Sequence, residues 1–294
     1  MSKRTQYAAT ALLIFITFVW GFTFVTNQYV LKTMSSPDLL AWRFCIAALV
    51  LLAFKPRAIL QLTSIERKHG LILGVFLTLG YLAQNAGLTK TTATASGFIT
   101  GMFVVLTPIV GGLIFRQRIS IAAWLAVALA TIGLALIAIQ GTSVNTGDLF
   151  SFLCAISFAF QIVLLSRWSK AEIVYGLATL QLLVTGISSL IISLISGGPA
   201  LPSDSKIWWS IALLSVIGSS LGFFAQTWVQ SQVSATRAAI ILTMEPVFAG
   251  IAGVTIGSDQ LTARLVAGAA CVLIAMYLVE LGPDKHELVV AIER

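Results

Sequence analysis

Long apolar runs separated by short polar stretches are the main pattern in this sequence. Each run extends over about 20 residues, the length that a helix needs to cross the hydrocarbon core of a bilayer. There are ten such runs, at approximately 8–32, 37–54, 69–88, 93–115, 119–140, 147–167, 172–197, 206–230, 234–257 and 261–281. The connections are short and contain turn residues, as in Ser35-Ser36-Pro37. The pattern predicts an all-α membrane protein with ten transmembrane helices.

The composition agrees with a protein that lies in a lipid bilayer. The chain is 58% hydrophobic and 10% charged, whereas soluble domains contain about 25% charged residues. The formal net charge is +7, but the basic residues occur in ones, twos and threes between apolar runs. They form no basic face or arm, so we expect no nucleic-acid partner.

The distribution of Lys and Arg between the connections predicts the orientation in the membrane. If the N-terminus is inside, basic residues favour the cytoplasmic side by roughly three to one. That side holds Lys3, Arg4, Lys55, Arg57, Arg67, Lys68, Arg116, Arg118, Arg167, Lys170, Lys285 and Arg294, and the other holds Lys32, Lys90, Lys206 and Arg264. We therefore expect a multi-pass protein of the cell (inner) membrane with both termini cytoplasmic, whose first run is retained as a helix.

An internal repeat relates the two halves of the chain. The third run contains Gly80-Tyr81-Leu82-Ala83-Gln84, and the eighth contains Gly222-Phe223-Phe224-Ala225-Gln226. The same register pairs Met102 with Met244. This indicates two five-helix modules, 8–140 and 147–281. Because five is odd, the modules insert with opposite orientation, which is typical of transporters with a site near the bilayer midplane.

The run at 234–257 carries an acidic residue, Glu245, at its middle, followed directly by Pro246. A carboxylate at this depth is costly unless it faces the interior of the bundle or water, so Glu245 is a functional candidate. The alternative is a structural group that is hydrogen-bonded to neighbouring helices. Proline removes a backbone donor, so we expect bends at Pro246 and at Pro108 in the fourth run.

Polar and aromatic side chains recur at helical spacing within several runs. The stripes contain Trp20, Thr23 and Asn27; Tyr81, Gln84 and Asn85; Ser157 and Gln161; and Ser219, Phe223 and Gln226. These runs correspond across the repeat, so we predict that they line a central cavity together with the fourth and ninth runs. The alternative is that these groups only join helices by hydrogen bonds. Aromatic walls with amides would suit an amino acid or a flat amphipathic metabolite.

A second costly charge, Arg43, lies within the second run. A buried guanidinium is always charged and seeks a carboxylate or backbone carbonyls. Glu245 is a candidate partner, whereas Asp38 is nearer in the sequence but does not share a helix face with Arg43 at ideal spacing. An Arg that only holds helix ends in place is the alternative.

These residues resemble the EamA-type ten-helix exporters of the drug/metabolite transporter superfamily. The resemblance rests on Trp20-Gly21, Pro37, Arg43-Phe44, Thr107-Pro108, Ala225-Gln226, the segment Ser234-Ala235-Thr236-Arg237-Ala238-Ala239, and Glu245-Pro246-Val247-Phe248-Ala249. The family also has an acidic turn after the fourth and ninth helices. Here the first turn, Phe115-Arg116-Gln117-Arg118, lacks the acid, and the second offers Asp259.

The resemblance implies a secondary transporter that exports small metabolites, often amino acids, by alternating access. Drugs, nucleosides and sugars remain open as substrates. Glu245 is the candidate proton carrier, since burial disfavours a charged carboxylate, and Arg43, Pro108 and Pro246 are candidates for coupling or gating. A facilitator without proton coupling is the alternative. A monomer or a homodimer would be compatible with the sequence.

An intramembrane enzyme is the distant alternative. Such an enzyme needs a nucleophile, a base or a metal at membrane depth. No histidine lies deep in a run, and no run holds two acidic residues. Cys45, Cys154 and Cys271 lack metal-ligand spacing. We therefore expect neither enzymatic activity nor a cofactor or metal.

Overall fold

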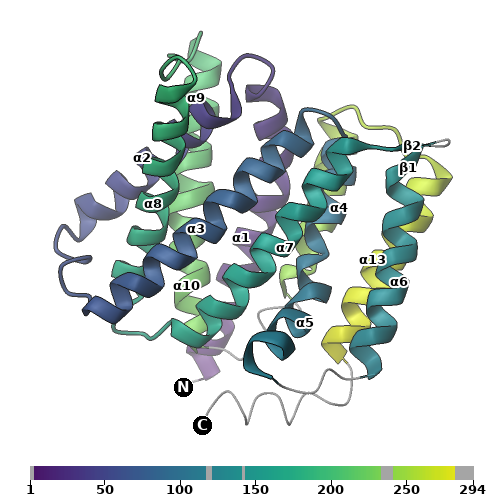
Figure 1. Cartoon of the computed structure of the whole chain (residues 1–294), viewed down its shortest axis with the longest axis horizontal. Coiled ribbons are helices and arrows are strands. Elements are labelled where there is room, and N and C mark those ends of the chain that lie inside the picture. The colour runs from purple at the N-terminus through teal and green to yellow at the C-terminus, as the bar shows by residue number, and fades with distance from the viewer. Residues whose placement is uncertain (1–2, 117–120, 141–142, 233–240, 282–294) are drawn as a thin grey trace.

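The computed structural model describes residues 3–116, 121–140, 143–232 and 241–281, and these residues form a bundle of helices (Figure 1). Within this part of the chain, seven helical segments are long and apolar enough to cross a membrane. Three shorter apolar helices, Trp124–Ile137, Met244–Thr255 and Ala263–Leu278, occupy the remaining predicted runs. The prediction of an all-α membrane protein is confirmed. The Ser234–Ala239 motif, Gln117, Arg118 and the tail after residue 281 lie outside the described residues.

The helices lie at the predicted runs, although α1 and α3 each begin five residues earlier than expected. They are α1 (Lys3–Val30), α2 (Ser36–Phe54), α3 (Ser64–Leu88), α4 (Ala93–Gly101), α5 (Phe103–Phe115), α6 (Ile121–Ala138), α7 (Thr146–Trp168), α8 (Val174–Ile195), α9 (Ser205–Leu213), the π-helix η1 (Leu214–Leu221), α10 (Gly222–Gln232), α12 (Met244–Thr255) and α13 (Ala263–Leu281). Two short antiparallel strands, β1 (Ile139–Gln140) and β2 (Ser143–Val144), connect α6 to α7.

Local sequence signals explain where several helices begin. At the start of α3, the Thr63 hydroxyl accepts a hydrogen bond from the backbone N–H of Glu66, and the Glu66 carboxylate accepts one from the N–H of Thr63. This reciprocal pair satisfies two backbone donors that would otherwise lack partners. Ser35 caps α2 and Thr92 caps α4 through the same kind of side-chain bond.

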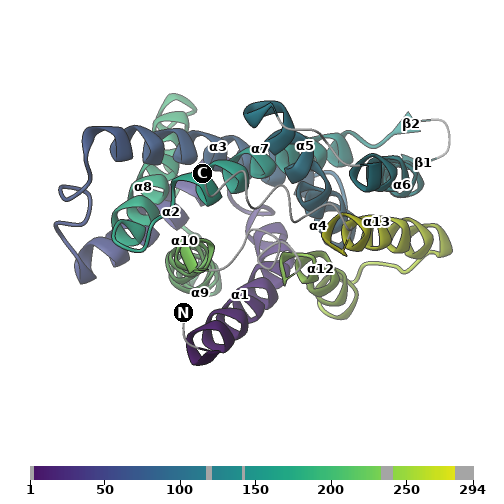
Figure 2. The ribbon, with the colours of Figure 1, turned by 90° about the horizontal axis from the view of Figure 1, so that it is seen from below.

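The helices pair across the two halves of the chain. Helix α3 lies beside α7, α2 beside α8, and α1 beside α12, while α6 and α13 form a separate pair at one end of the long axis (Figure 2). Helices α1, α3, α7 and α10 surround the centre of the molecule together with α4, α5 and α12. Polar groups on these helices can therefore face one another away from lipid.

The fourth and ninth runs are both interrupted near their middle. Helix α4 ends at Gly101 and α5 begins at Phe103, with a turn at Met102, and a turn at Thr243 precedes α12. Pro246 therefore lies in the first turn of α12, where a missing N–H leaves no bond unmade. Pro108 lies inside α5, which continues through it. The interruption of the fourth run is thus at Met102 and not at the proline, where a bend was expected.

Helices α4 and α12 approach each other closely through glycines. A Cβ atom at Gly97 would clash with the Cβ of Ala249, and one at Gly253 would clash with the Thr94 hydroxyl. A Cβ at Gly101 would lie 2.9 Å from Cγ of Pro246. Small residues of this kind allow helix backbones to pack tightly in a membrane.

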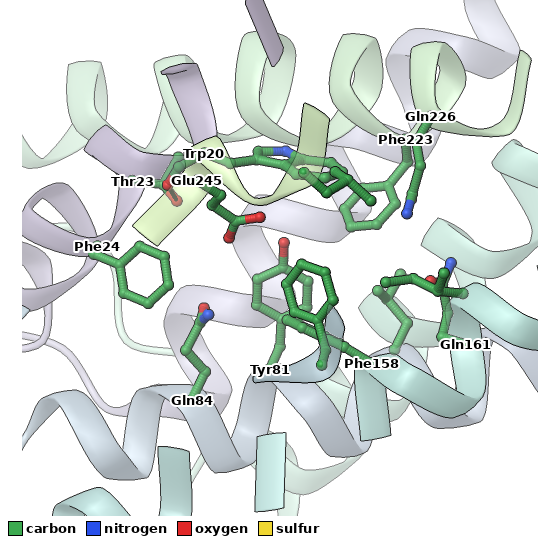
Figure 3. Close-up of a pocket in the computed structure, with 14 residues that line it drawn as sticks. Trp20, Thr23, Phe24, Tyr81, Gln84, Phe158, Gln161, Phe223, Gln226 and Glu245 are labelled. Carbon is green, nitrogen blue, oxygen red and sulfur yellow. Dashed lines mark hydrogen bonds between the residues drawn. The ribbon is translucent and has the colours of Figure 1, made fainter. Parts of the chain in front are cut away.

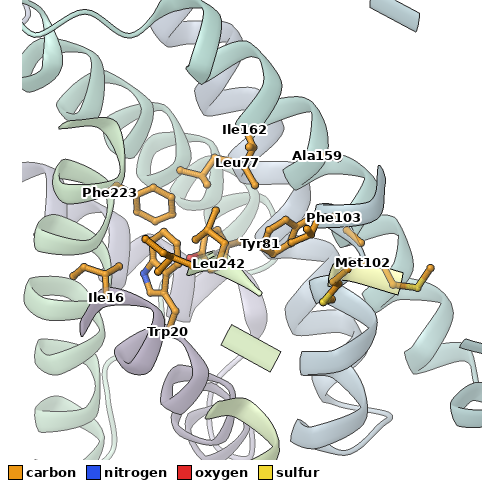
Figure 4. Packing of buried hydrophobic residues seen from close by; sticks show 14 of the residues in the cluster. Ile16, Trp20, Leu77, Tyr81, Met102, Phe103, Ala159, Ile162, Phe223 and Leu242 are labelled. Atoms are coloured by element: carbon orange, nitrogen blue, oxygen red, sulfur yellow. The ribbon is translucent and has the colours of Figure 1, made fainter. Parts of the chain in front are cut away.

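The largest apolar cluster lies at the centre of the bundle (Figure 4). It includes the rings of Trp20, Phe44, Tyr81 and Phe223. Large apolar side chains are also exposed on the outside, such as Leu49 at 63% and Ile195 at 82%. An exposed apolar surface around a partly polar interior is what a lipid-facing bundle requires.

Candidate functional site

A central cavity lies among helices from both halves of the chain (Figure 3). It encloses about 440 Å³ of empty space when the part that opens to its surroundings is included. Its aromatic walls are Trp20, Phe24, Tyr81, Phe103, Phe158 and Phe223. Its polar lining is Thr23, Gln84, Gln161, Gln226 and Glu245. Leu77, Ile162 and Leu242 complete it.

Most of the residues selected from the polar stripes lie in this lining. Seven of the ten proposed substrate-binding residues line the cavity, namely Trp20, Thr23, Tyr81, Gln84, Gln161, Phe223 and Gln226. The lining comes from α1, α3, α5, α7, α10, Leu242 and α12, which are the first, third, fourth, sixth, eighth and ninth runs. The remaining three residues, Asn27, Asn85 and Ser219, are fully buried but lie outside the lining.

The polar stripes of the sequence do not include the apolar part of the lining. Phe24, Phe103 and Phe158 contribute rings to the cavity. In a membrane helix, an inward phenylalanine has the same sequence signal as one that faces lipid. Only Phe158 had a usable indication, because it lies next to Ser157 and one turn from Gln161.

The π-helix η1 explains why Ser219 does not line the cavity together with Phe223 and Gln226. Ser219, Phe223 and Gln226 share one face only if the helix is regular, and a π-helix has wider turns. Ser219 lies in η1, and its hydroxyl accepts a hydrogen bond from Nε of Arg43 at 2.7 Å. Phe223 and Gln226 follow in α10 and face the cavity.

Trp20 is held against the same π-helix. Its indole Nε1 donates a hydrogen bond to the carbonyl of Gly218 at 2.7 Å, and its ring packs 5.3 Å from that of Phe223. A Cβ at Gly222 would lie 2.7 Å from the indole nitrogen. The ring that forms one wall of the cavity is therefore fixed by contacts between the first and eighth runs.

Arg43 is fully buried next to the cavity but is not part of its lining. Its guanidinium donates hydrogen bonds to Ser219, to Oδ1 of Asn27 at 3.3 Å and to the Tyr81 hydroxyl at 3.4 Å. All three acceptors are neutral. Neither candidate carboxylate bonds to Arg43 among the described residues, and Asp38 instead accepts a hydrogen bond from Ser193.

Glu245 lies in the first turn of α12 and lines the cavity, with 6% of its surface exposed. Figure 3 shows its carboxyl group pointing toward Tyr81 and Gln84. Among the described residues, no hydrogen bond reaches this carboxyl group and no Lys, Arg or His shares the lining. Its position in the first turn of α12 places it at the positive end of the helix dipole.

The three glutamines of the lining differ in how they are held. The Gln161 amide donates to Oε1 of Gln181 at 3.0 Å, and Gln181 donates to the Thr227 hydroxyl at 3.3 Å. The Oε1 atom of Gln226 is buried and has no hydrogen-bond partner among the described residues. An unpartnered buried acceptor is costly, so Gln226 is suited to bind a ligand. Asn85 is also buried without a partner for either amide atom, but it lies outside the lining.

The sequence comparison assigns the chain to a family. The model of the EamA-like transporter family matches residues 8–139 and 145–281. The chain belongs to this family. An uncharacterized transporter from Archaeoglobus fulgidus is 31% identical over 275 residues, covering 92% of this chain and 84% of that protein. The uncharacterized transporter YyaM of Bacillus subtilis is 25% identical over 269 residues, covering 87% and 88%.

A solved crystal structure has the same fold as this EamA-like transporter. It aligns with a TM-score of 0.66 over 98% of this chain and 99% of its own, at 16% identity. The family match and the curated relatives confirm the resemblance to the drug/metabolite transporter superfamily, and the protein is a multi-pass membrane protein of a transporter family.

Proposed function

We propose that this EamA-like transporter binds a small amphipathic metabolite, an amino acid or a related compound, in the central cavity and exports it from the cytoplasm by alternating access. One observation carries this proposal. Aromatic faces, an unpartnered amide oxygen and a carboxylate from both halves of the chain meet around one cavity.

The lining supports an amphipathic substrate. Trp20, Tyr81 and Phe223 offer apolar surface for a side chain. Gln84 and Gln226 offer amide donors and acceptors. Glu245 is a carboxylate without a basic partner in the described lining, so it favours a substrate with an ammonium group, or a proton.

The pairing of helices supports alternating access between two inverted modules, 8–140 and 147–281. If each helix is replaced by its counterpart in the other module, the contact of α3 with α7 becomes that of α10 with α1. In the same way, the contact of α12 with α1 becomes that of α5 with α7. The pairs α2 with α8, α4 with α12 and α6 with α13 map onto themselves. Helix contacts that are equivalent in this way are expected if two modules rock about a shared site.

The direction of transport rests on the orientation proposed from the basic residues, with both termini in the cytoplasm of the cell or inner membrane. In that orientation the connections after α3, β1 and α12 lie outside. Hydrogen bonds hold these outer ends together. Thr91 donates to Asp148, and Asn145 donates to the carbonyl of Lys90. Thr94 donates to Asp259. These bonds favour a conformation that is closed outside, which can load substrate from the cytoplasm.

A proton-coupled mechanism assigns Glu245 as the carrier, since it is the one carboxyl group in the described lining. A facilitator that needs no proton is the second mechanism. The two differ in a simple measurement, because only the coupled transporter would accumulate substrate in response to an imposed pH gradient.

Metabolite efflux from cells that overexpress the protein tests the function and identifies the substrate. We expect a small amine-containing metabolite to fall inside the cell and rise in the medium. Trp20→Ala and Gln226→Ala should each reduce this efflux at least tenfold with normal membrane insertion. Trp209→Ala and Gln61→Ala are matched controls at exposed positions and should keep it. Equal efflux from all four variants would reject the cavity as the binding site.

A further inference from the structure

Two buried groups of opposite charge flank the cavity, and neither has a charged partner among the described residues. Arg43 lies behind Tyr81 and donates only to neutral oxygens. Glu245 lies on the opposite wall without a hydrogen bond. Since charges act strongly on each other where water is excluded, the cavity has a positive side at Tyr81 and a negative side at Glu245.

Tyr81 is fixed in position at the positive side. Its ring lies 4.8 Å from the Arg43 guanidinium and 4.8 Å from the Phe44 ring centroid, and it packs 5.3 Å from the ring of Phe158. These contacts, a cation–π contact among them, leave the side chain little freedom to turn away from the cavity.

The hydrogen bond from Arg43 decides what the Tyr81 hydroxyl can do. A phenol oxygen both accepts and donates, and here it accepts from Nη2 of Arg43 at 3.4 Å, a long bond. The guanidinium has no acceptor, so the hydroxyl proton must point elsewhere. Figure 3 shows the hydroxyl directed into the cavity, toward the Glu245 carboxyl group on the other wall. The cavity is therefore bordered by a donor backed by a positive charge and by a carboxylate that faces it.

We propose that Tyr81 and Glu245 bind the two charged ends of a zwitterionic α-amino acid, and that Arg43 is the positioning residue that orients the Tyr81 hydroxyl. The substrate carboxylate accepts a hydrogen bond from Tyr81, and its ammonium group binds Glu245. The side chain lies against the aromatic walls. This inference rests on the proposed function, and it adds that recognition requires both charged ends of the substrate.

Three related probes separate the two ends of the substrate. Phenylalanine carries both charged groups, phenethylamine carries only the ammonium, and 3-phenylpropionate carries only the carboxylate. The measurement is uptake of radiolabelled phenylalanine into proteoliposomes by counterflow, with the other two compounds as competitors. A site built to bind a polar group strongly rejects an analogue that lacks it. For the parent protein, we expect the half-saturation concentration to be at least tenfold lower for phenylalanine than for either analogue.

Tyr81→Phe is the decisive variant, because it removes one oxygen and keeps the ring contacts. It should raise the half-saturation concentration for phenylalanine roughly tenfold, the effect expected from the loss of one hydrogen bond to a charged group. The half-saturation concentration for phenethylamine should stay unchanged. Arg43→Gln should act in the same direction, although it also removes the bonds to Ser219 and Asn27. A merely structural role of Arg43 would weaken both probes alike. Tyr175→Phe is the control, since Tyr175 packs on Phe224 outside the lining.

The outcomes distinguish this inference from the proposed function. If the parent protein carries phenylalanine and the Tyr81 and Arg43 variants keep its preference over phenethylamine, the inference is wrong and the function stands. If phenethylamine competes as well as phenylalanine in the parent protein, or if no probe is carried, the inference is also wrong. Absence of any metabolite efflux from overexpressing cells would instead reject the function.

Discussion

Asp259, in the turn after α12, accepts two hydrogen bonds from Thr94, the second residue of α4. The backbone N–H donates at 2.8 Å and the hydroxyl at 2.7 Å. The carboxylate thus caps a helix of the other half of the chain, where it also meets the positive end of the helix dipole. Gly253 permits this contact, because a Cβ there would clash with both side chains. The register of the sequence repeat pairs Asp259 with Gln117 in the first half of the chain, so the sequence provides this acid in one half only.

Removing this carboxylate should loosen the outer end of the α4–α12 pair. We expect Asp259→Ala to lower the free energy of unfolding by about 1 kcal/mol, the usual value of a helix cap, and to change the transport rate. Thermal unfolding of the purified protein and transport in proteoliposomes measure the two effects. Asp204→Ala is the matched control, because Asp204 caps α9, the helix that directly follows it, by accepting from two backbone N–H groups. It should cost similar stability without changing the transport rate, and equal transport effects of the two variants would contradict this role of Asp259.

The packing of α4 on α12 should not tolerate a side chain at Gly97. We expect Gly97→Val to destabilise the protein by roughly 1–3 kcal/mol, the cost of overpacking, because its Cβ would meet Ala249. Thermal unfolding gives the comparison. Gly111→Ala in α5 is the control, since nothing lies within 4 Å of an added Cβ there, and it should be neutral or slightly stabilising. A neutral Gly97→Val would show that the two helices separate easily.

Proton coupling, if present, should depend on Glu245. Glu245→Gln keeps the size of the side chain and removes its ability to release a proton. We expect the variant to carry substrate down its gradient but to lose accumulation driven by a pH gradient across proteoliposomes. Glu172→Gln, at an exposed position, should behave like the parent protein. Gradient-driven accumulation that survives in Glu245→Gln would reject Glu245 as the proton carrier and require another one, whereas a parent protein without such accumulation would be a facilitator.

The indole of Trp20 should matter for more than its aromatic face. Trp20→Phe retains a ring but loses the hydrogen bond to Gly218, which leaves a buried carbonyl of η1 without this donor. We expect a loss of about 1–3 kcal/mol in stability and a weaker half-saturation for substrate. Thermal unfolding and transport of the same preparation check both. Unchanged stability and half-saturation would mean that other hydrogen bonds satisfy the Gly218 carbonyl in the variant.

Several features of the site followed from the sequence because of the high cost of placing polar groups in lipid. Gln84, Gln226 and Glu245 lie in long apolar runs, so they had to face the interior, and helical spacing added Trp20 and Tyr81. The interruption at Met102 was not predictable in this way. Pro108 is the stronger sequence signal for a bend, but α5 accommodates it.

The amino-acid sequence by itself determined the membrane class, the approximate positions of the apolar helices and the set of polar residues that avoid lipid, because these depend on local hydropathy and helical period. The tertiary structure decided which of these polar groups face the cavity and which bind one another. Arg43 meets Ser219 across 176 positions of the chain, through a π-helix whose wider turn no hydropathy pattern encodes. Such contacts depend on how distant helices pack, and this packing is set by shape rather than by polarity.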